Sequence, residues 1–247
     1  MIQFHPSRSK ALEQLQSFVE NHLGLYARDR NFDFGPEKRT NTSCLSPYVT
    51  HGILSESEII KQSLKQYSFS KIEKFIQEVL WRTYWKGWLE RRPSVWTDFI
   101  NDLKYLKVDY ESDKNLKAAV NGNTDIDCFN DWVNELKETG YLHNHTRMWF
   151  SSILIFTLDL PWQLGAEFFM RYLKDGDSAS NTLSWRWTAG VQTKGKNYVA
   201  QEWNIKKFTN GKYDKVKLNE NAVPIISDKE YVQIDPDFTN ANITEYQ

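Results

Sequence analysis

The sequence predicts an all-α protein with an extended acidic C-terminal tail. Apolar residues recur at three-to-four spacing in several segments, no alternating strand pattern is found, and apolar residues thin out beyond about residue 216. We therefore expect one helical domain over residues 1–216 and an irregular acidic tail over residues 217–247.

The individual helices follow in chain order. The first covers about residues 9–23, where leucines and a valine share one face. Ser55 and Glu58 form a capping box that opens the second. A wide apolar band predicts a third helix over residues 75–90.

The second half of the chain has a less even pattern. Residues 104–124 are polar and irregular, which predicts loop with short helices. Two further helices are expected over residues 141–158 and 163–173, and Pro161 between them fits a first helical turn.

Charge is unevenly distributed although the formal net charge is −1. Residues 171–215 contain nine basic and four acidic residues, a net of +5, whereas residues 219–247 contain six acids and one lysine, a net of −5. A basic stretch suited to phosphates is thus followed by an acidic tail.

Several classes of protein are disfavoured. Cys44 and Cys128 have no metal-ligand neighbours at suitable spacing, and His143 and His145 point apart on a helix, so no metal site is expected. Neither a membrane-length apolar run nor a secretion signal is found, so a cytoplasmic monomer without a membrane partner is expected.

The run DGDSASNTLSWRW, from Asp175 to Trp187, combines two acids, an amide and two tryptophans. Ionised carboxylates are costly in an apolar wall unless each has a donor or a charge beside it. The run therefore indicates a bound polar partner with aromatic character.

Three other segments carry chemistry. Thr42, Ser43 and Ser46 place hydroxyls at a predicted helix N-terminus, which is either an anion cradle or a plain cap. Glu78, Trp81 and Arg82 share one helix face, as a functional cluster or as an internal Glu–Arg pair beside a core tryptophan. The third segment is TGYLHNHTRM, residues 139–148.

Together these motifs resemble the DNA photolyase and cryptochrome family. DGDSASN with Trp-x-Trp resembles its flavin-binding signature, TSCLSPY its diphosphate loop, EVLWR its ELIWRE and TGYLHNHTRM its TGWMHNRxRM. The resemblance covers about residues 26–213 and implies a helical FAD-binding domain. The family's N-terminal antenna domain has no counterpart, so no antenna chromophore is expected.

The resemblance also implies roles for individual residues. For FAD they are Tyr26, Thr42, Ser43, Leu45, Ser46, Arg147, Asp175, Asp177 and Asn181, with Arg147 able to pair with Asp175 and Asn181 facing the flavin N5. For the lesion they are Glu78, Trp81, Arg82, Asn144, His145, Met148 and Trp187. Trp185 and Trp162 match an electron-transfer chain whose surface exit is left open among Tyr105, Tyr110, Trp96 and Trp149.

Some positions depart from the family pattern. Thr83 and His145 replace a usual Glu and Arg, and residues 125–131 match the family's GYPxxDA segment weakly. His145 puts substrate affinity or lesion choice in doubt.

The function implied is light-driven repair of cyclobutane pyrimidine dimers in DNA by a photolyase, through electron transfer from photoexcited reduced FAD. Catalysis would rest on Glu78, Asn181, Trp185 and Trp162, and phosphate contacts on Arg82, Arg186, Lys194 and Lys196. Single- and double-stranded DNA both remain open as substrates. The alternatives are a cryptochrome-like blue-light photoreceptor without repair and a light-independent nucleic-acid-binding module.

Overall fold

The computed structural model describes residues 4–227 and 229–234, and every regular element within them is helical, as the sequence predicts. The first group of elements is α1 Arg8–Asn21, a 3-10 turn Leu23–Leu25, α2 Tyr26–Asp29, α3 Ser46–Thr50, α4 Glu56–Leu64 and α5 Phe69–Glu90. The second group is α6 Pro93–Asp109, α7 Lys114–Asn121, α8 Asp127–Thr139, α9 Asn144–Ser152, a π-helical segment Ile153–Thr157, α10 Trp162–Tyr172, α11 Ser178–Ala189 and α12 Glu202–Phe208.

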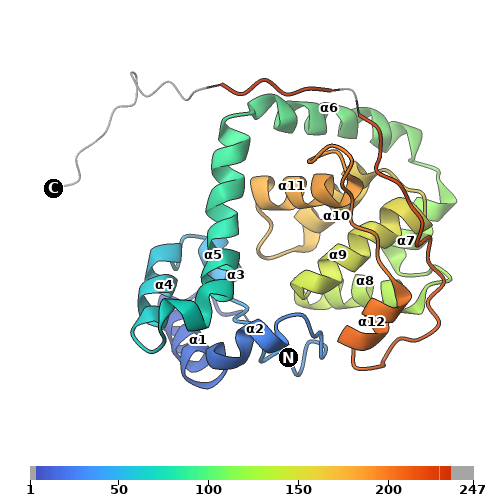
Figure 1. Ribbon diagram of the computed structural model, residues 1–247. Coiled ribbons are helices and arrows are strands. Elements are labelled where there is room, and N and C mark those ends of the chain that lie inside the picture. Colours follow the sequence, from blue (N-terminus) through green and yellow to red (C-terminus); the bar gives the residue numbers. More distant parts are fainter. Residues whose placement is uncertain (1–3, 228, 235–247) are drawn as a thin grey trace.

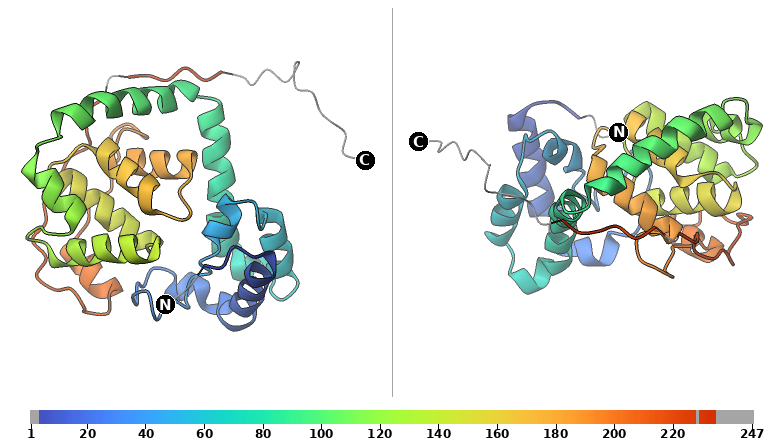
Figure 2. Two further views of the ribbon diagram at one scale, coloured as in Figure 1. Left: turned by 180° about the vertical axis from the view of Figure 1, so that it is seen from behind. Right: turned by 90° about the horizontal axis from the view of Figure 1, so that it is seen from above.

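Helix α5 connects two groups of helices. The short N-terminal helices gather at one of its ends, and α6 turns away from the other end to run across α10 and α11 (Figures 1 and 2). Helix α11 packs directly against α5 and α10.

Each group has its own hydrophobic core. Residues of α1, α4 and α5 form one cluster, which includes Leu15, Phe18, Ile59 and Phe75. Residues of α6 to α12 form a larger one, and Leu89, Val95, Ala179 and Leu183 make a small third cluster between α5, α6 and α11. The two main cores are therefore separate, and the polar loops between them lie where the two groups of helices meet.

Glycine at position 165 lets α10 and α11 approach closely. A Cβ atom at Gly165 would lie 2.3 Å from Cη2 of Trp185, which is far inside van der Waals contact. The indole of Trp185 is consequently buried across α10, where it meets Phe169 edge to face with ring centroids 5.0 Å apart.

Comparison with the expected elements gives one confirmation and one correction. The capping box of Ser55 and Glu58 is present at the start of α4. The prediction of loop with short helices over residues 104–124 fits the short helix α7 but is wrong at its start, because the long helix α6 extends to Asp109. The apolar stripe of α6 begins upstream, at Val95 and Phe99, so a segment starting at residue 104 shows only its polar end.

Residues 217–227 and 229–234 lie against the helical body. We call residues 217–227 and 229–234 the C-terminal strap; it contains no helix or strand, and residues 235–247 of the predicted acidic tail lie outside the described residues. The Ile225 N–H donates to the Ala189 carbonyl at 2.9 Å, and the Ile234 N–H donates to the Arg91 carbonyl at 2.8 Å. These bonds fasten the strap to the ends of α11 and α5.

The strap covers Arg186 of α11. The guanidinium carbon of Arg186 lies 4.9 Å from the ring centroid of Tyr231 and 6.0 Å from that of Trp162. Arg186 also donates to Gln192 Oε1 at 3.0 Å and to the Val191 carbonyl at 3.1 Å. Arg186 is therefore buried and is not available for the expected surface contact with a phosphate.

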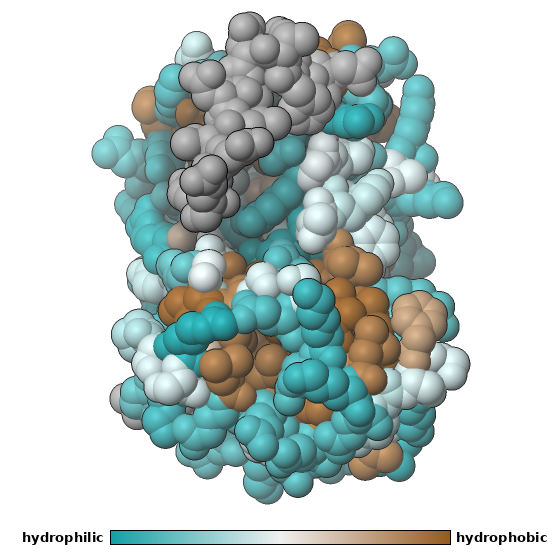
Figure 3. Space-filling view, turned by 90° about the vertical axis from the view of Figure 1, so that its left-hand side faces the viewer, coloured by the Kyte–Doolittle hydropathy of each residue, from teal (hydrophilic) through white to brown (hydrophobic). Residues whose placement is uncertain are grey.

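The outer face of the N-terminal helices mixes polar and apolar side chains (Figure 3). Exposed apolar residues on these helices include Leu12, Leu64, Phe69 and Leu80. Of the helices in the described residues, none has the length and hydropathy needed to cross a bilayer.

Candidate functional site

Asp175 lies at the junction of the two cores, in the loop between α10 and α11. Its side chain is nearly inaccessible, and Oδ2 accepts hydrogen bonds from Ser46 Oγ and, at 2.9 Å, from Arg147 Nη2. Thr50 Oγ1 donates to the Asp175 backbone carbonyl at 3.1 Å. The pair of Arg147 with Asp175 expected from the sequence is thus present, and it links α3, α9 and the loop before α11.

Asp177 plays two parts at the start of α11. Its Oδ1 accepts the Ser180 N–H at 2.8 Å and so caps the helix. Its Oδ2 faces Arg82 and Lys86 of α5, each 3.7 Å away. These two contacts are ion pairs at a separation longer than a hydrogen bond.

Two charged groups at this junction carry buried atoms without a hydrogen-bond partner among the described residues. They are Oδ1 of Asp175 and Nη1 of Arg82, and hydroxyls of Ser180 and Thr182 on α11 share this property. Buried polar atoms are costly unless something completes their hydrogen bonds. A ligand that fits must therefore offer an N–H or O–H group to Asp175 and an acceptor to Arg82.

The loop before α3 is held in a fixed path. Gln14 Nε2 donates to the Ser43 and Cys44 carbonyls at 2.7 and 3.1 Å, and Cys44 adopts a left-handed backbone with φ of +50°. Thr42 and Ser43 are partly buried, and Leu45 belongs to the N-terminal core. Of the predicted hydroxyls, Ser46 is the one whose hydrogen bond reaches the Asp175 carboxylate.

Glu78 forms its ion pair with a residue outside its own helix. Its partner is Arg30, in the segment after α2, and both side chains are partly exposed. Arg82, the expected intrahelical partner, faces Asp177 instead. Tyr26 lies nearby: burial is the largest cause that raises its pKa, and the charge of Glu78 adds to the effect.

Trp81 lies one turn after Glu78 and is 47% exposed. Helix α5 therefore presents an accessible ring beside the ion-paired carboxylate of Glu78. Across the junction, Trp187 of α11 is partly buried and stacks on Tyr198 with ring centroids 5.7 Å apart.

The buried residues of α10 and α11 include Asn181, Trp185 and Trp162. The Asn181 amide nitrogen donates to the Ala166 carbonyl at 2.8 Å, so its oxygen is turned away from α10. Trp162 stacks on Phe99 of α6 with centroids 5.6 Å apart. Of the candidate exit rings, Trp149 is fully buried, whereas Tyr105 is exposed.

The predicted substrate-binding residues of α9 differ in how exposed they are. Asn144 is exposed and Met148 is partly buried. His145 stacks on Trp149 with centroids 4.2 Å apart, and its Nδ1 lies 2.9 Å from the Asn31 carbonyl. Burial lowers the pKa of His145, so a neutral, packed imidazole stands at this predicted substrate position.

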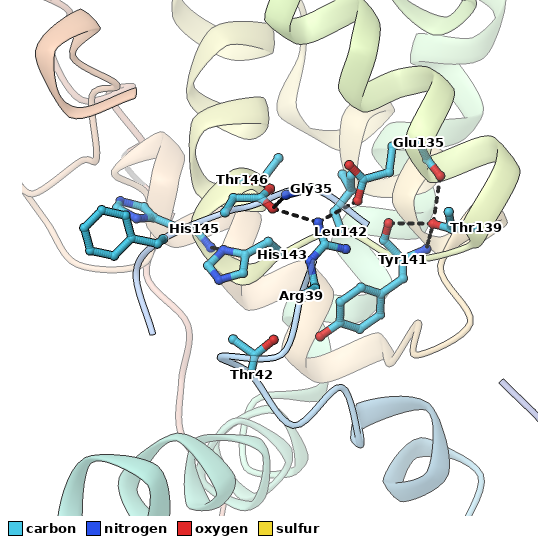
Figure 4. A network of polar contacts seen from close by, with 12 residues as sticks. Gly35, Arg39, Thr42, Glu135, Thr139, Tyr141, Leu142, His143, His145 and Thr146 are labelled. Atoms are coloured by element: carbon cyan, nitrogen blue, oxygen red, sulfur yellow. Dashed lines mark hydrogen bonds and ion pairs between the residues drawn. The ribbon is translucent and has the colours of Figure 1, made fainter. Parts of the chain in front are cut away.

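A buried ionic network next to the site was missed by sequence reasoning. Arg39 donates to Asp33 Oδ1 at 2.9 Å and to Glu135 Oε1 at 2.8 Å, and Thr146 Oγ1 donates to Asp33 Oδ2 (Figure 4). Arg39 directly precedes the Thr42 loop, so this network anchors the loop to α8 and α9. The charged residues of this segment were the only signal, because Glu135 lies 96 residues from Arg39 and Thr146 lies 113 residues from Asp33.

Because His143, at the start of α9, is buried, we expect the folded protein to lose stability in acid. Burial lowers its pKa to about 4 from an ordinary 6.5, so between these values the unfolded chain binds a proton that the folded chain does not. The free energy of unfolding should fall by roughly 3 kcal/mol from pH 7 to pH 4 through this group. Urea unfolding across that range measures it.

The control is His143→Asn, which retains an N-cap acceptor but cannot titrate. The free energy of unfolding of this variant should fall less between pH 7 and pH 4. His145, whose pKa is also lowered, accounts for part of the fall that remains. An unchanged slope in the variant would exclude His143 as its source.

Comparison with known proteins shows which family this chain matches. The family model described as the FAD binding domain of DNA photolyase matches residues 75–218. The deoxyribodipyrimidine photo-lyase of Buchnera aphidicola subsp. Baizongia pistaciae is 31% identical over 201 residues, covering 75% of this chain and 39% of that protein. That of Escherichia coli K12 is 27% identical over 208 residues, covering 79% and 42%.

Solved structures agree with this match. A class III photolyase from Agrobacterium tumefaciens aligns with a TM-score of 0.65 and 25% identity, over 83% of this chain and 43% of that one. A cryptochrome from Synechocystis sp. PCC6803 aligns with a TM-score of 0.73 and 23% identity, over 85% and 44%, which is a likeness of fold. The chain thus spans about two fifths of the length of the curated relatives it matches.

Proposed function

The chain belongs to the family of FAD-binding domains of DNA photolyase, and from this membership we propose that it repairs cyclobutane pyrimidine dimers in DNA under light. The observation that carries the proposal is made at the junction around Asp175. There, buried charged atoms of α5 and of the loop before α11 have no hydrogen-bond partner among the described residues, which is the environment that a polar ligand would complete.

The residues at this junction fit FAD. A dinucleotide cofactor offers anionic oxygens that suit Arg82 and Lys86, and hydroxyl and N–H groups that suit the free oxygen of Asp175. Arg147 and Ser46 hold the other oxygen of Asp175, so the carboxylate is positioned before any ligand arrives. Tyr26 and the Thr42–Ser46 loop are proposed as further contacts.

The bound cofactor would supply absorption of blue light and donation of one electron. Asn181 would present its amide oxygen, because its nitrogen is tied to the Ala166 carbonyl. After bond cleavage the electron would return from the separated pyrimidines to the cofactor, so no external reductant would be consumed per turnover. Trp185 and Trp162 are proposed to serve reduction of the resting cofactor.

The lesion would be bound by α5, α9 and α11. A dimer must leave the base stack before its bonds can be reached, and it then needs a ring to stack on. Trp81 is exposed and lies one turn from Glu78, which Arg30 holds in place. Asn144 is exposed as well, and Met148, His145 and Trp187 complete the proposed set.

The test is light-driven repair of an oligonucleotide carrying one thymine dimer, by chemically reduced protein under anaerobic conditions. Trp81→Ala should retain the flavin absorption band but lower the repair rate at subsaturating DNA about 5- to 100-fold, since one stacked base is worth about 1–3 kcal/mol. Tyr105→Ala, which removes an exposed ring of α6, is the matched control and should repair normally.

Equal repair by the Trp81→Ala variant and the wild type would contradict the placement of the lesion on α5. If the wild-type protein holds FAD and photoreduces it but repairs nothing, the photoreceptor function replaces the repair function.

A further inference from the structure

The C-terminal half of α5 carries a cluster of aromatic rings. Trp81 stacks on Trp85 with centroids 5.6 Å apart, and Tyr84 meets Trp81 and Trp85 edge-on at 5.4 and 5.1 Å. Tyr84 is 52% exposed. We call Trp81, Tyr84 and Trp85 the α5 aromatic platform.

The platform rests on a firm base. Trp85 packs on the small hydrophobic cluster formed by Leu89, Val95, Ala179 and Leu183 at the meeting of α5, α6 and α11. The outer rings, Trp81 and Tyr84, are therefore held in place by a partly buried neighbour while their own faces stay in contact with water. Exposed rings of this size lose the hydrophobic gain of burial, so a second role for them is expected.

The surroundings of the platform are basic. Between Trp81 and Arg92 the chain has four basic residues and one acid, Glu90. Lys86 has 45% of its side chain exposed, and the guanidinium carbon of Arg92 lies 4.5 Å from the Trp88 ring centroid. Rings interleaved with cations are the combination that binds single-stranded nucleic acid, because bases stack on the rings and phosphates meet the cations.

We propose that the α5 aromatic platform binds the unpaired, undamaged bases of single-stranded DNA, with Tyr84 and Trp85 as stacking residues outside the lesion pocket. The proposal rests on the proposed function in that it assigns the same DNA partner a second contact. The net positive charge of the segment favours a polyanion over a protein with an apolar face. Single-stranded DNA would then be preferred, because paired bases cannot reach the rings.

The experiment measures binding in the dark, without a lesion, so that its failure is distinct from failure of repair. The probe is a fluorescently labelled oligothymidylate of twelve nucleotides, titrated with the full-length flavin-loaded protein and followed by anisotropy. Tyr84→Ala should weaken binding at least about fivefold, the lower limit for one stacked base. Tyr84→Phe retains the ring and should bind as the wild type does.

Two controls separate stacking from general attraction to phosphate. Tyr105→Ala removes a more exposed ring, 73% accessible, from α6 and should leave binding unchanged. A probe of the same length that lacks bases should bind the wild type and the Tyr84→Ala variant equally and more weakly than oligothymidylate. Arg91→Ala, which removes an exposed cation from the same segment, should reduce the salt dependence of binding, by about 0.7 in the log–log slope for one phosphate contact.

The proposal is overturned if Tyr84→Ala binds oligothymidylate as tightly as the wild type does, or if the baseless probe binds as tightly as oligothymidylate. It is also overturned if Tyr84→Ala abolishes self-association in sedimentation velocity while DNA binding stays unchanged, since the platform would then join two copies of the chain.

Discussion

Replacing Asp175 with asparagine is expected to abolish stable FAD binding and to lower the free energy of unfolding of the FAD-free protein by about 3 kcal/mol. The substitution retains the shape of the side chain but removes the charge that Arg147 faces at 2.9 Å. Arg147 would then keep a partly buried positive charge without its counter-ion, which is the costly outcome of breaking such a pair.

The measurements are the flavin absorbance per protein after gel filtration and urea unfolding of the FAD-free form. Asp177→Asn is the matched control, because asparagine caps a helix as well as aspartate does and the ion pairs of Asp177 are 3.7 Å long. The control should lose much less stability. Equal losses in both variants would show that Asp175 has no special place in the junction.

Replacing Arg39 with methionine is expected to destabilise the protein by about 3–5 kcal/mol at pH 7, because two buried carboxylates then lose their counter-ion. The Arg39 side chain is 3% exposed and contacts both Asp33 and Glu135. Although burial acts to raise the pKa of Asp33, the charge of Arg39 is the largest opposing influence and the pKa is lowered overall.

The loss should shrink as the pH falls. Without Arg39 the pKa of Asp33 should rise above its unfolded value, and the pKa of Glu135, which burial already raises, should rise further, so protonation below about pH 5 favours the folded variant. Urea unfolding of both proteins from pH 7 to pH 4 tests this convergence. Arg28→Met, which removes an exposed pair with Asp29, should behave as the wild type does. A loss that stays constant with pH would rule out the electrostatic account.

Local features were predictable from the sequence. The capping box at Ser55 depends on residues three apart, and the all-α class depends on short-range periodicity. The pair of Arg147 with Asp175 was also predicted, but only through resemblance to a family, since nothing in the spacing of these residues brings them together.

Long-range contacts were not predictable from the residues themselves. Glu78 has Arg82 four residues away on its own helix, yet Arg30, 48 residues upstream, is its partner. The network of Arg39 with Glu135 spans 96 residues. Such pairs depend on how the two cores meet, which helix periodicity does not encode.

The C-terminal strap has an electrostatic consequence for Trp162. By closing over Arg186 it keeps a permanent positive charge within 6.0 Å of that indole and away from bulk water, where the charge would be screened. A nearby cation disfavours removal of an electron from a ring, so the strap raises the oxidation potential of Trp162. In the proposed electron-transfer chain, the strap would therefore set how readily an electron vacancy moves outward from Trp185 to Trp162.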